Sequence, residues 1–182
     1  MSATGGTNRE GVILGNCTLI VGILLPLQTP AQEKVQIPDL RLEKGLRRIL
    51  QEPIRLLYRD DLARIRTLSL RGSEIQSVVG LEHCTNMTAL DLTFNKISDL
   101  KPLAGLTALT ELNLSSNLLV DVSPLNALVA LKDLDLSFNR VSDVSTLSNL
   151  DALTELNLSF NLLARCAATR RACGPEGCGS EL

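Results

Sequence analysis

One pattern returns every 22 residues between Leu68 and Leu158, and it constrains the fold more than any other feature of this 182-residue chain. Each copy carries two leucines separated by a single residue. The five pairs are Leu68 and Leu70, Leu90 and Leu92, Leu112 and Leu114, Leu134 and Leu136, and Leu156 and Leu158. A fixed period of this length is the signature of a stacked repeat, in which each unit buries its apolar face against its neighbours. The sequence therefore predicts a short solenoid.

The spacing within each copy has a physical cause. Side chains alternate along a strand, so Leu112 and Leu114 are expected to point inward while Glu111 and Asn113 point outward. Three residues after the second leucine the chain must leave the strand, and an asparagine amide can both donate to and accept from the backbone at that corner. This predicted ladder consists of Asn95, Asn117, Asn139 and Asn161, with Ser73 in the first copy.

The complete frame, L-x-x-L-x-L-x-x-N-x-I-x-x-I-x-x-L, is the leucine-rich repeat frame. In its tail, N-x-I-x-D-[LV]-x-P-L, Pro102 and Pro124 suit the first position of a 3₁₀ segment. The 22-residue unit resembles the repeat of bacterial internalins, and the resemblance covers residues 37–163. It implies an α/β leucine-rich repeat solenoid. Such a fold is a short, curved, right-handed stack with a parallel concave sheet of about five strands, a 3₁₀ or irregular convex side and a helical N-terminal cap.

We expect the helical cap over residues 32–64. Asp39 follows a proline and is suited to the N-cap position of a first helix. Pro53 ends this helix, and Asp60 or Asp61 is expected to cap a short second one. The apolar stripe of the first helix, at helical spacing, consists of Leu42, Leu46, Ile49 and Leu50.

Residues 1–31 are expected to be a signal peptide or a hydrophobic anchor, because the run 12–27 is apolar and almost uncharged. Its length suits a signal-peptide core better than a membrane span, but the positive charge ahead of it is weak, so cleavage and anchoring both remain open. Either outcome favours a secreted or cell-envelope protein over a cytoplasmic one. The repeats are expected over residues 65–166, and residues 167–182 are expected to form an irregular tail because the frame fails at Thr169 and Ala172.

Signs of catalysis are absent from the sequence. His83 is the only histidine, and no phosphate loop, nucleophile motif or metal-ligand spacing occurs, so we expect no enzyme activity, catalytic residue, cofactor or metal. A basic stretch over residues 33–71 lacks interleaved aromatic residues, which disfavours nucleic acid as a partner. Cys84 stands in a leucine slot and is expected to be a core thiol. Pairing among Cys166, Cys173 and Cys178 remains open.

The outward-facing strand positions are the candidate partner-binding surface. Their acidic and amide side chains form two columns on the predicted concave face. The first column contains Glu111, Asp133 and Glu155, and the second contains Asp91, Asn113, Asp135 and Asn157. The three phenylalanines of the chain, Phe94, Phe138 and Phe160, all stand just before a ladder asparagine. They are either exposed anchors for a partner or a structural lip of stacked rings.

These features favour a non-catalytic module that binds a protein partner through the concave face. Five strands about 4.8 Å apart make a patch on the order of 300 Å², well below the roughly 800 Å² per partner of a standard interface. Binding should therefore be weak or should recruit the rim. Two alternatives remain open: a structural or surface-display envelope protein without a specific ligand, and an intracellular enzyme-regulatory subunit.

Overall fold

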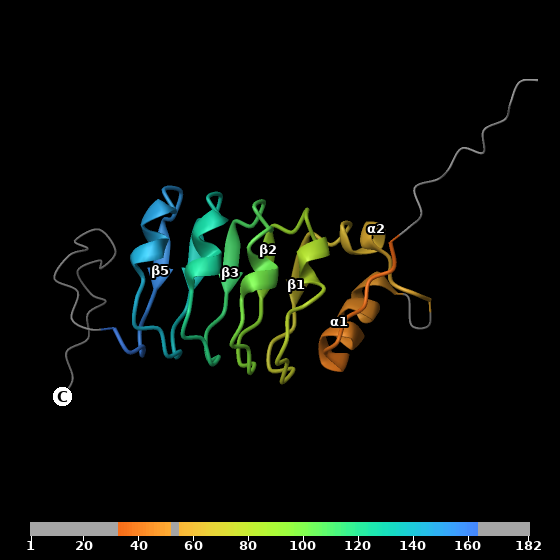
Figure 1. Ribbon diagram of the computed structural model, residues 1–182, viewed down its shortest axis with the longest axis horizontal. Coiled ribbons are helices and arrows are strands. Elements are labelled where there is room, and N and C mark those ends of the chain that lie inside the picture. The colour runs from red at the N-terminus through yellow and green to blue at the C-terminus, as the bar shows by residue number, and fades with distance from the viewer. Residues whose placement is uncertain (1–32, 52–54, 164–182) are drawn as a thin grey trace, which may run out of the picture. The chain divides into compact units, whose positions relative to one another are not determined.

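The structure, a computed structural model, describes residues 33–51 and 55–163, which belong to one compact unit. Five short parallel strands lie side by side in chain order in a single open sheet (Figure 1). They are β1 (Thr67–Ser69), β2 (Ala89–Asp91), β3 (Glu111–Asn113), β4 (Asp133–Asp135) and β5 (Glu155–Asn157). Each strand pairs with the next at an offset of 22 residues, so that Leu68 faces Leu90 and Leu134 faces Leu156. The repeat period therefore sets the register of the sheet.

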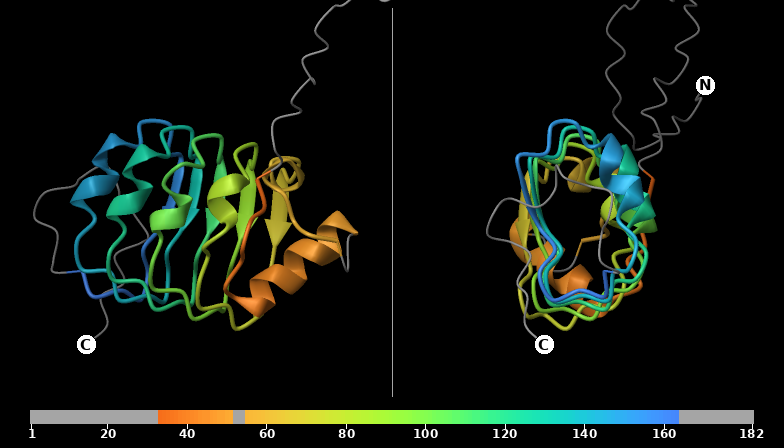
Figure 2. Two further views of the ribbon diagram at one scale, coloured as in Figure 1. Left: turned by 45° about the vertical axis from the view of Figure 1, so that its right-hand side comes forward. Right: turned by 90° about the vertical axis from the view of Figure 1, so that its left-hand side faces the viewer.

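The opposite side of each coil is a short 3₁₀ segment, as predicted. These segments are η1 (Leu81–His83), η2 (Lys101–Leu103), η3 (Ser123–Ala127) and η4 (Ser145–Asn149). Pro102 and Pro124 lie in the first turn of η2 and η3, where a missing N–H costs nothing. Seen end-on, the successive coils superpose (Figure 2). The fold is the short, curved leucine-rich repeat solenoid that the sequence predicted.

The core runs along the inside of the stack as columns of aliphatic side chains. In the third copy, Leu112, Leu114, Leu119, Val122 and Leu125 are all buried. Each such side chain contributes about 1.5 to 3 kcal/mol when it is removed from water. The predicted core thiol is confirmed, because Cys84 is fully buried, and this burial, with a smaller effect of Glu82, raises its pKa to about 12.

Two helices, α1 (Leu40–Leu50) and α2 (Arg59–Leu62), cover the first coil. Leu42 and Leu46 of α1 are fully buried, whereas Ile49 is 39% exposed, so the buried stripe is narrower than predicted. Gly45 explains how closely α1 approaches the first coil. A Cβ atom at this position would lie 2.8 Å from Cδ1 of Leu70, too near for an ordinary contact.

The predicted N-cap of α1 is confirmed, whereas Asp61 takes part in the cap of α2 from inside the helix, in a capping box with Tyr58. The side chain of Asp39 accepts hydrogen bonds from the backbone N–H groups at the start of α1. In α2 the N-cap residue is Tyr58, and Asp61 lies inside the helix. The carboxylate of Asp61 accepts hydrogen bonds from the backbone N–H of Tyr58 at 3.1 Å and from Arg55 at 2.7 Å. Asp60 makes no cap because the helix begins before it.

Several predictions fall on residues outside the described ranges. These are the signal peptide or anchor, the irregular tail and the pairing of Cys166, Cys173 and Cys178. Among the described helices, none has both the length and the apolar character needed to cross a membrane.

Candidate protein-binding face

The predicted asparagine ladder forms the corner between each strand and the return path. Asn117 is buried, and its Oδ1 atom accepts a hydrogen bond from the backbone N–H of Ile97 at 3.1 Å. Its Nδ2 atom donates to the carbonyls of Leu92 and Leu114, both at 3.0 Å. Each amide therefore joins its own coil to the preceding one. Asn95, Asn139 and Asn161 make the same contacts, so the structural role predicted for the ladder is seen at all four positions.

The second acidic column also makes contacts within the repeat, which the sequence reasoning missed. The Oδ1 atom of Asp135 accepts a hydrogen bond from the backbone N–H of Ser137 at 2.8 Å, and Asn113 binds Ser115 in the same way. Asp91 and Asn157 make the equivalent contact. The signal was present in the sequence as an Asp or Asn placed two residues before a Ser or Thr, a spacing that favours this local turn. One oxygen of each side chain is thus used to end a strand.

Asp91 carries the strongest local interactions of this column. Partial burial raises its pKa, but hydrogen bonds from Thr93 and Ser69 and the positive charge of Arg71 outweigh burial and hold the pKa below its ordinary value. Asp91 is therefore ionised at neutral pH and is tied to its own coil.

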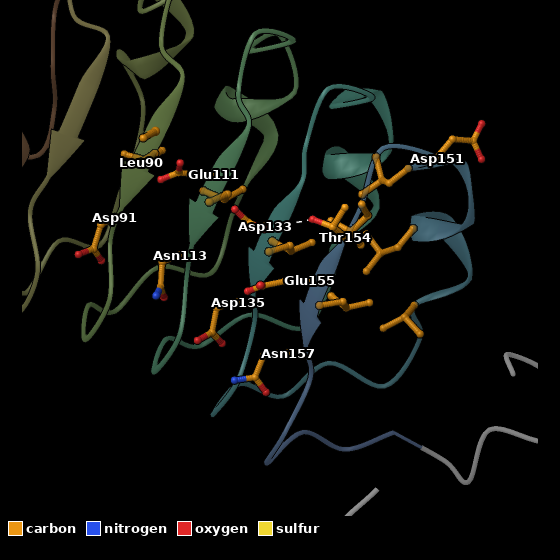
Figure 3. Close-up of a pocket in the computed structure, with 18 of the residues that line it drawn as sticks. Leu90, Asp91, Glu111, Asn113, Asp133, Asp135, Asp151, Thr154, Glu155 and Asn157 are labelled. Carbon is orange, nitrogen blue, oxygen red and sulfur yellow. Dashed lines mark hydrogen bonds between the residues drawn. The ribbon is translucent and has the colours of Figure 1, made fainter. Parts of the chain in front are cut away.

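The side chains of the first column make fewer hydrogen bonds than those of the second. Glu111 and Glu155 are exposed, and their carboxylates have no hydrogen-bond or ion-pair partner among the described residues. Asp133 accepts only a long hydrogen bond of 3.4 Å from the hydroxyl of Thr154. Figure 3 shows the two columns as parallel rows across the strands. The first row is therefore the more available of the two for a ligand.

These two columns border a hollow of about 1440 Å³ that extends from the sheet onto the last coil, where Val144, Leu147 and Leu150 also line it. The described residues that line it include six carboxylates and no lysine or arginine. The carboxylates are Asp91, Glu111, Asp133, Asp135, Asp151 and Glu155. Like charges on a concave surface reinforce one another and raise the local concentration of cations or basic groups.

The three phenylalanines lie outside this hollow, so the structure does not join them to the acidic columns. Phe94, Phe138 and Phe160 are all at least half exposed and are not among the residues that line the hollow. The rings of Phe138 and Phe160 stack with centroids 4.2 Å apart and an interplanar angle of 11°. Arg71 lies over the ring of Phe94, with its Cζ atom 5.0 Å from the centroid.

The backbone at these phenylalanine positions has an unusual conformation. The φ angles of Phe94, Phe138 and Phe160 are 57°, 55° and 56°, in the left-handed region, and Ser116 shares the conformation with 56°. Gly72 is the equivalent residue of the first copy and has a φ of 62°. This position bends the chain away from the strand, and the glycine in the first copy was the only sequence signal for it.

Within the described part of the chain, no group of three or more His, Cys, Asp or Glu side chains is placed to hold a metal ion. What the arrangement can do chemically is attract and hydrogen-bond positively charged groups.

A family model for leucine-rich repeats in units of two copies matches residues 63–105, 90–127 and 107–149. Two solved internalins from Listeria monocytogenes str. 4b F2365, InlF and InlC2, are each 28% identical to the chain with a TM-score of 0.62. They cover 70% and 72% of this chain, which covers 45% of InlF and 70% of InlC2. This chain thus spans less than half the length of InlF.

The functional domain of InlJ from Listeria monocytogenes, which includes a cysteine ladder, is 30% identical with a TM-score of 0.62. It covers 69% of this chain, and the chain covers 28% of it. Leucines replace Cys84 at the equivalent positions of the next three copies, Leu106, Leu128 and Leu150. No curated protein sequence matches the chain.

Proposed function

Because this chain is an internalin-type leucine-rich repeat protein, we propose that it is a non-catalytic module that binds a protein partner through the concave face of its sheet. The partner surface is basic. The apolar run over residues 12–27 supports a place outside the cytoplasm, either secreted or at the cell envelope.

One observation carries this proposal: the hollow is lined by carboxylates with no cation among its described lining residues. The carboxylates of Glu111, in the middle strand, and Glu155, in the last strand, have no described hydrogen-bond or ion-pair partner, and Asp133 lies between them. An unneutralised surface of one sign steers an oppositely charged partner and sets its orientation more than it adds raw affinity. We therefore place the first contacts with the partner on Glu111, Asp133 and Glu155.

The experiment compares two charge reversals in the full chain. Binders are first selected from a library of displayed protein domains, and their association rates are then measured over a range of salt concentrations. Glu111→Lys should slow association and flatten its salt dependence. Asp60→Lys is the matched control, since Asp60 is an exposed carboxylate of the cap and lies away from the hollow. Equal effects of both reversals, or no effect of Glu111→Lys, would refute a concave-face site.

A further inference from the structure

A row of equivalent residues follows the strands, one from each coil, three residues after the ends of β2, β3, β4 and β5. Backbone hydrogen bonds hold the row in register across the coils. The N–H of Phe94 donates to the carbonyl of Ser115 at 3.0 Å, and the N–H of Ser116 donates to that of Ser137 at 2.9 Å. All members share the left-handed backbone conformation. They are Phe94, Ser116, Phe138 and Phe160, and we call them the lip row.

The rings of the lip row bind flat groups from neighbouring coils. Phe138 and Phe160 stack with centroids 4.2 Å apart, and the guanidinium of Arg71 lies over Phe94. Arg71 comes from the coil before Phe94, and Ser116 comes from the coil after it. Among the described residues, no ring or guanidinium group covers Phe94 from the side of Ser116.

Ser116 leaves the lip row one ring short. Phe94 and Phe138 belong to coils that are two steps apart, about 9 to 10 Å by the spacing of parallel strands. This separation is about twice the 4.2 Å between the stacked rings of Phe138 and Phe160. One planar group therefore fits between the two rings in contact with both. Both rings remain accessible, since Phe94 is 54% and Phe138 is 53% exposed.

Charge favours a guanidinium as this planar group. The same coils carry Asp91 and Asp135, three residues before the two rings, and six carboxylates line the hollow beside them. They outnumber the cations that follow the rings, Lys96 and Arg140, and Lys96 is paired with Glu74 at 3.6 Å. The contact of Arg71 with Phe94 shows within this chain that a lip ring accepts a guanidinium face.

We propose that the position of the missing ring binds an arginine side chain of the partner, with its guanidinium between Phe94 and Phe138. A lysine ammonium is compact and not planar, so it cannot contact two ring faces in this way. The inference rests on the proposed function, because it takes the partner to be basic. It adds a preference for arginine over lysine, which is set by residues that do not line the hollow.

The test measures binding of two labelled peptides of equal charge, hexa-arginine and hexalysine, to the full chain by fluorescence anisotropy. We expect hexa-arginine to bind about 2- to 30-fold more tightly. Carboxylates alone also favour arginine to some degree, because a guanidinium can pair with both of their oxygens. The decisive quantity is therefore how the ratio of the two Kd values depends on the lip row.

Ser116→Phe places a ring at the missing position and should remove most of the arginine preference. The fold accepts this residue, because the three phenylalanines of the lip row have the same backbone conformation. The melting temperature should rise, since the new ring stacks on Phe94 and Phe138. Phe94→Leu should also lower the preference while leaving the Kd of hexalysine unchanged. Asn126→Phe is the matched control, because Asn126 is an exposed residue of η3 on the opposite side of the same coil.

Three results would each overturn the arginine site. They are a Kd ratio that Ser116→Phe leaves intact, an equal loss of preference in Asn126→Phe, and failure of Ser116→Phe to fold. None of them affects the concave-face proposal, for which Glu111→Lys should weaken both peptides alike. If neither peptide binds the native chain, the basic partner is refuted, and the arginine site with it.

Discussion

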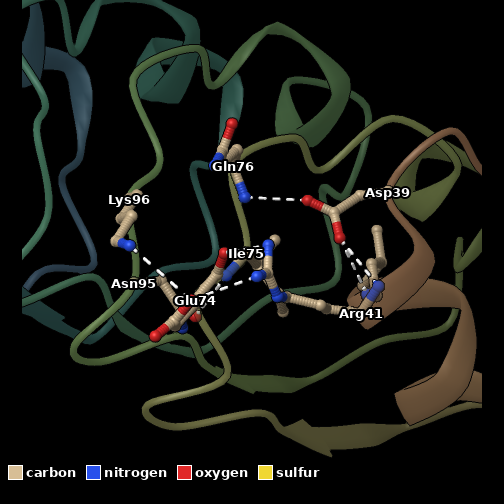
Figure 4. A network of polar contacts seen from close by, with 8 residues as sticks. Asp39, Arg41, Glu74, Ile75, Gln76, Asn95 and Lys96 are labelled. Atoms are coloured by element: carbon tan, nitrogen blue, oxygen red, sulfur yellow. Dashed lines mark hydrogen bonds and ion pairs between the residues drawn. The ribbon is translucent and has the colours of Figure 1, made fainter.

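Asp39 and Gln76, which are 37 positions apart, are joined by a hydrogen bond of 2.8 Å from the backbone N–H of Gln76 to Oδ2 of Asp39. The same oxygen accepts from Ser77 at 3.2 Å, while Oδ1 accepts from Arg41 and Leu42 in the first turn of α1. One carboxylate therefore caps the helix and ties it to the return path of the first coil (Figure 4). Nearby, Arg41 and Lys96 both pair with Glu74, which adds exposed contacts across the same junction.

The junction should weaken in acid. Partial burial raises the pKa of Asp39, but hydrogen bonds from four backbone N–H groups outweigh this and hold the pKa below its ordinary value. A lowered folded-state pKa means that the stabilisation is complete above the unfolded value of about 4 and is lost as pH falls through the lower folded value. Asp39→Ala should cost about 1 to 3 kcal/mol at neutral pH.

The free energy of unfolding of the native chain and of Asp39→Ala is measured by urea denaturation at pH values from neutral to acidic. The difference between the two free energies should shrink as pH falls. Asp60→Ala serves as the control, because Asp60 is exposed and makes no cap. A constant difference across the whole pH range would contradict the assigned role.

Neighbouring residues of the third copy should respond very differently to truncation. Asn117→Ala leaves the buried N–H of Ile97 unpaired and removes one of the two asparagine donors to the carbonyls of Leu92 and Leu114. It should lower the free energy of unfolding by about 1 to 3 kcal/mol. Ser116→Ala should be nearly silent, because its side chain lies outside the ladder. Chemical denaturation of both variants gives the comparison, and equal midpoints would show that the ladder is not a source of stability.

A glycine at position 116 should stabilise the chain. The φ of Ser116 is 56°, a conformation that costs a side-chain-bearing residue about 1 kcal/mol and glycine almost nothing. Part of this gain is offset because glycine makes the unfolded chain more flexible. Ser98→Gly is the control, since Ser98 is exposed and has no positive φ. Calorimetry should give a higher melting temperature for Ser116→Gly than for Ser98→Gly. The reverse order would contradict the assignment of backbone strain to Ser116.

The stacked rings should matter more for stability than for binding. Phe138 and Phe160 contact each other and lie outside the hollow, so Phe160→Ser should cost about 0.5 to 1.5 kcal/mol beyond the apolar area that it loses. Dissociation of a bound partner should not change. A double-mutant cycle of the two phenylalanines isolates the ring–ring interaction. A faster dissociation rate with an unchanged melting temperature would instead favour the anchor interpretation.

Sequence patterns predicted most of the structure of the repeats, but fewer of the contacts between the cap and the first coil. Strand register, the asparagine ladder and the core position of Cys84 follow from local patterns that recur every 22 residues, and the structure confirms all three. The second role of Asp39 could not be predicted, because the hydrogen bonds that its carboxylate accepts from Gln76 and Ser77 depend on how the cap docks on the first coil. The same holds for Gly45, whose close approach to Leu70 exists only in the folded chain.

Within the candidate site, the positions of the two columns could be predicted, but the hydrogen bonds of their side chains could not. Alternation along a strand places Glu111 and Asn113 on one face, but it does not distinguish a free carboxylate from one that ends a strand. The left-handed conformation at Phe94 and its equivalents could likewise not be predicted, and only Gly72 in the first copy indicated it. Which of the concave residues contact a partner remains a prediction.

The asparagine ladder also limits how such a chain can change its length during evolution. Because Asn117 binds backbone atoms one coil back, at Leu92 and Ile97, adding or removing a whole 22-residue unit preserves these bonds along the stack. A duplicated copy brings its own asparagine and its own inward leucines, and it can join the stack without any change elsewhere. A shorter insertion at the corner shifts every later amide away from its carbonyls. Solenoids of this kind should therefore lengthen or shorten by gene-level duplication or loss of entire repeats.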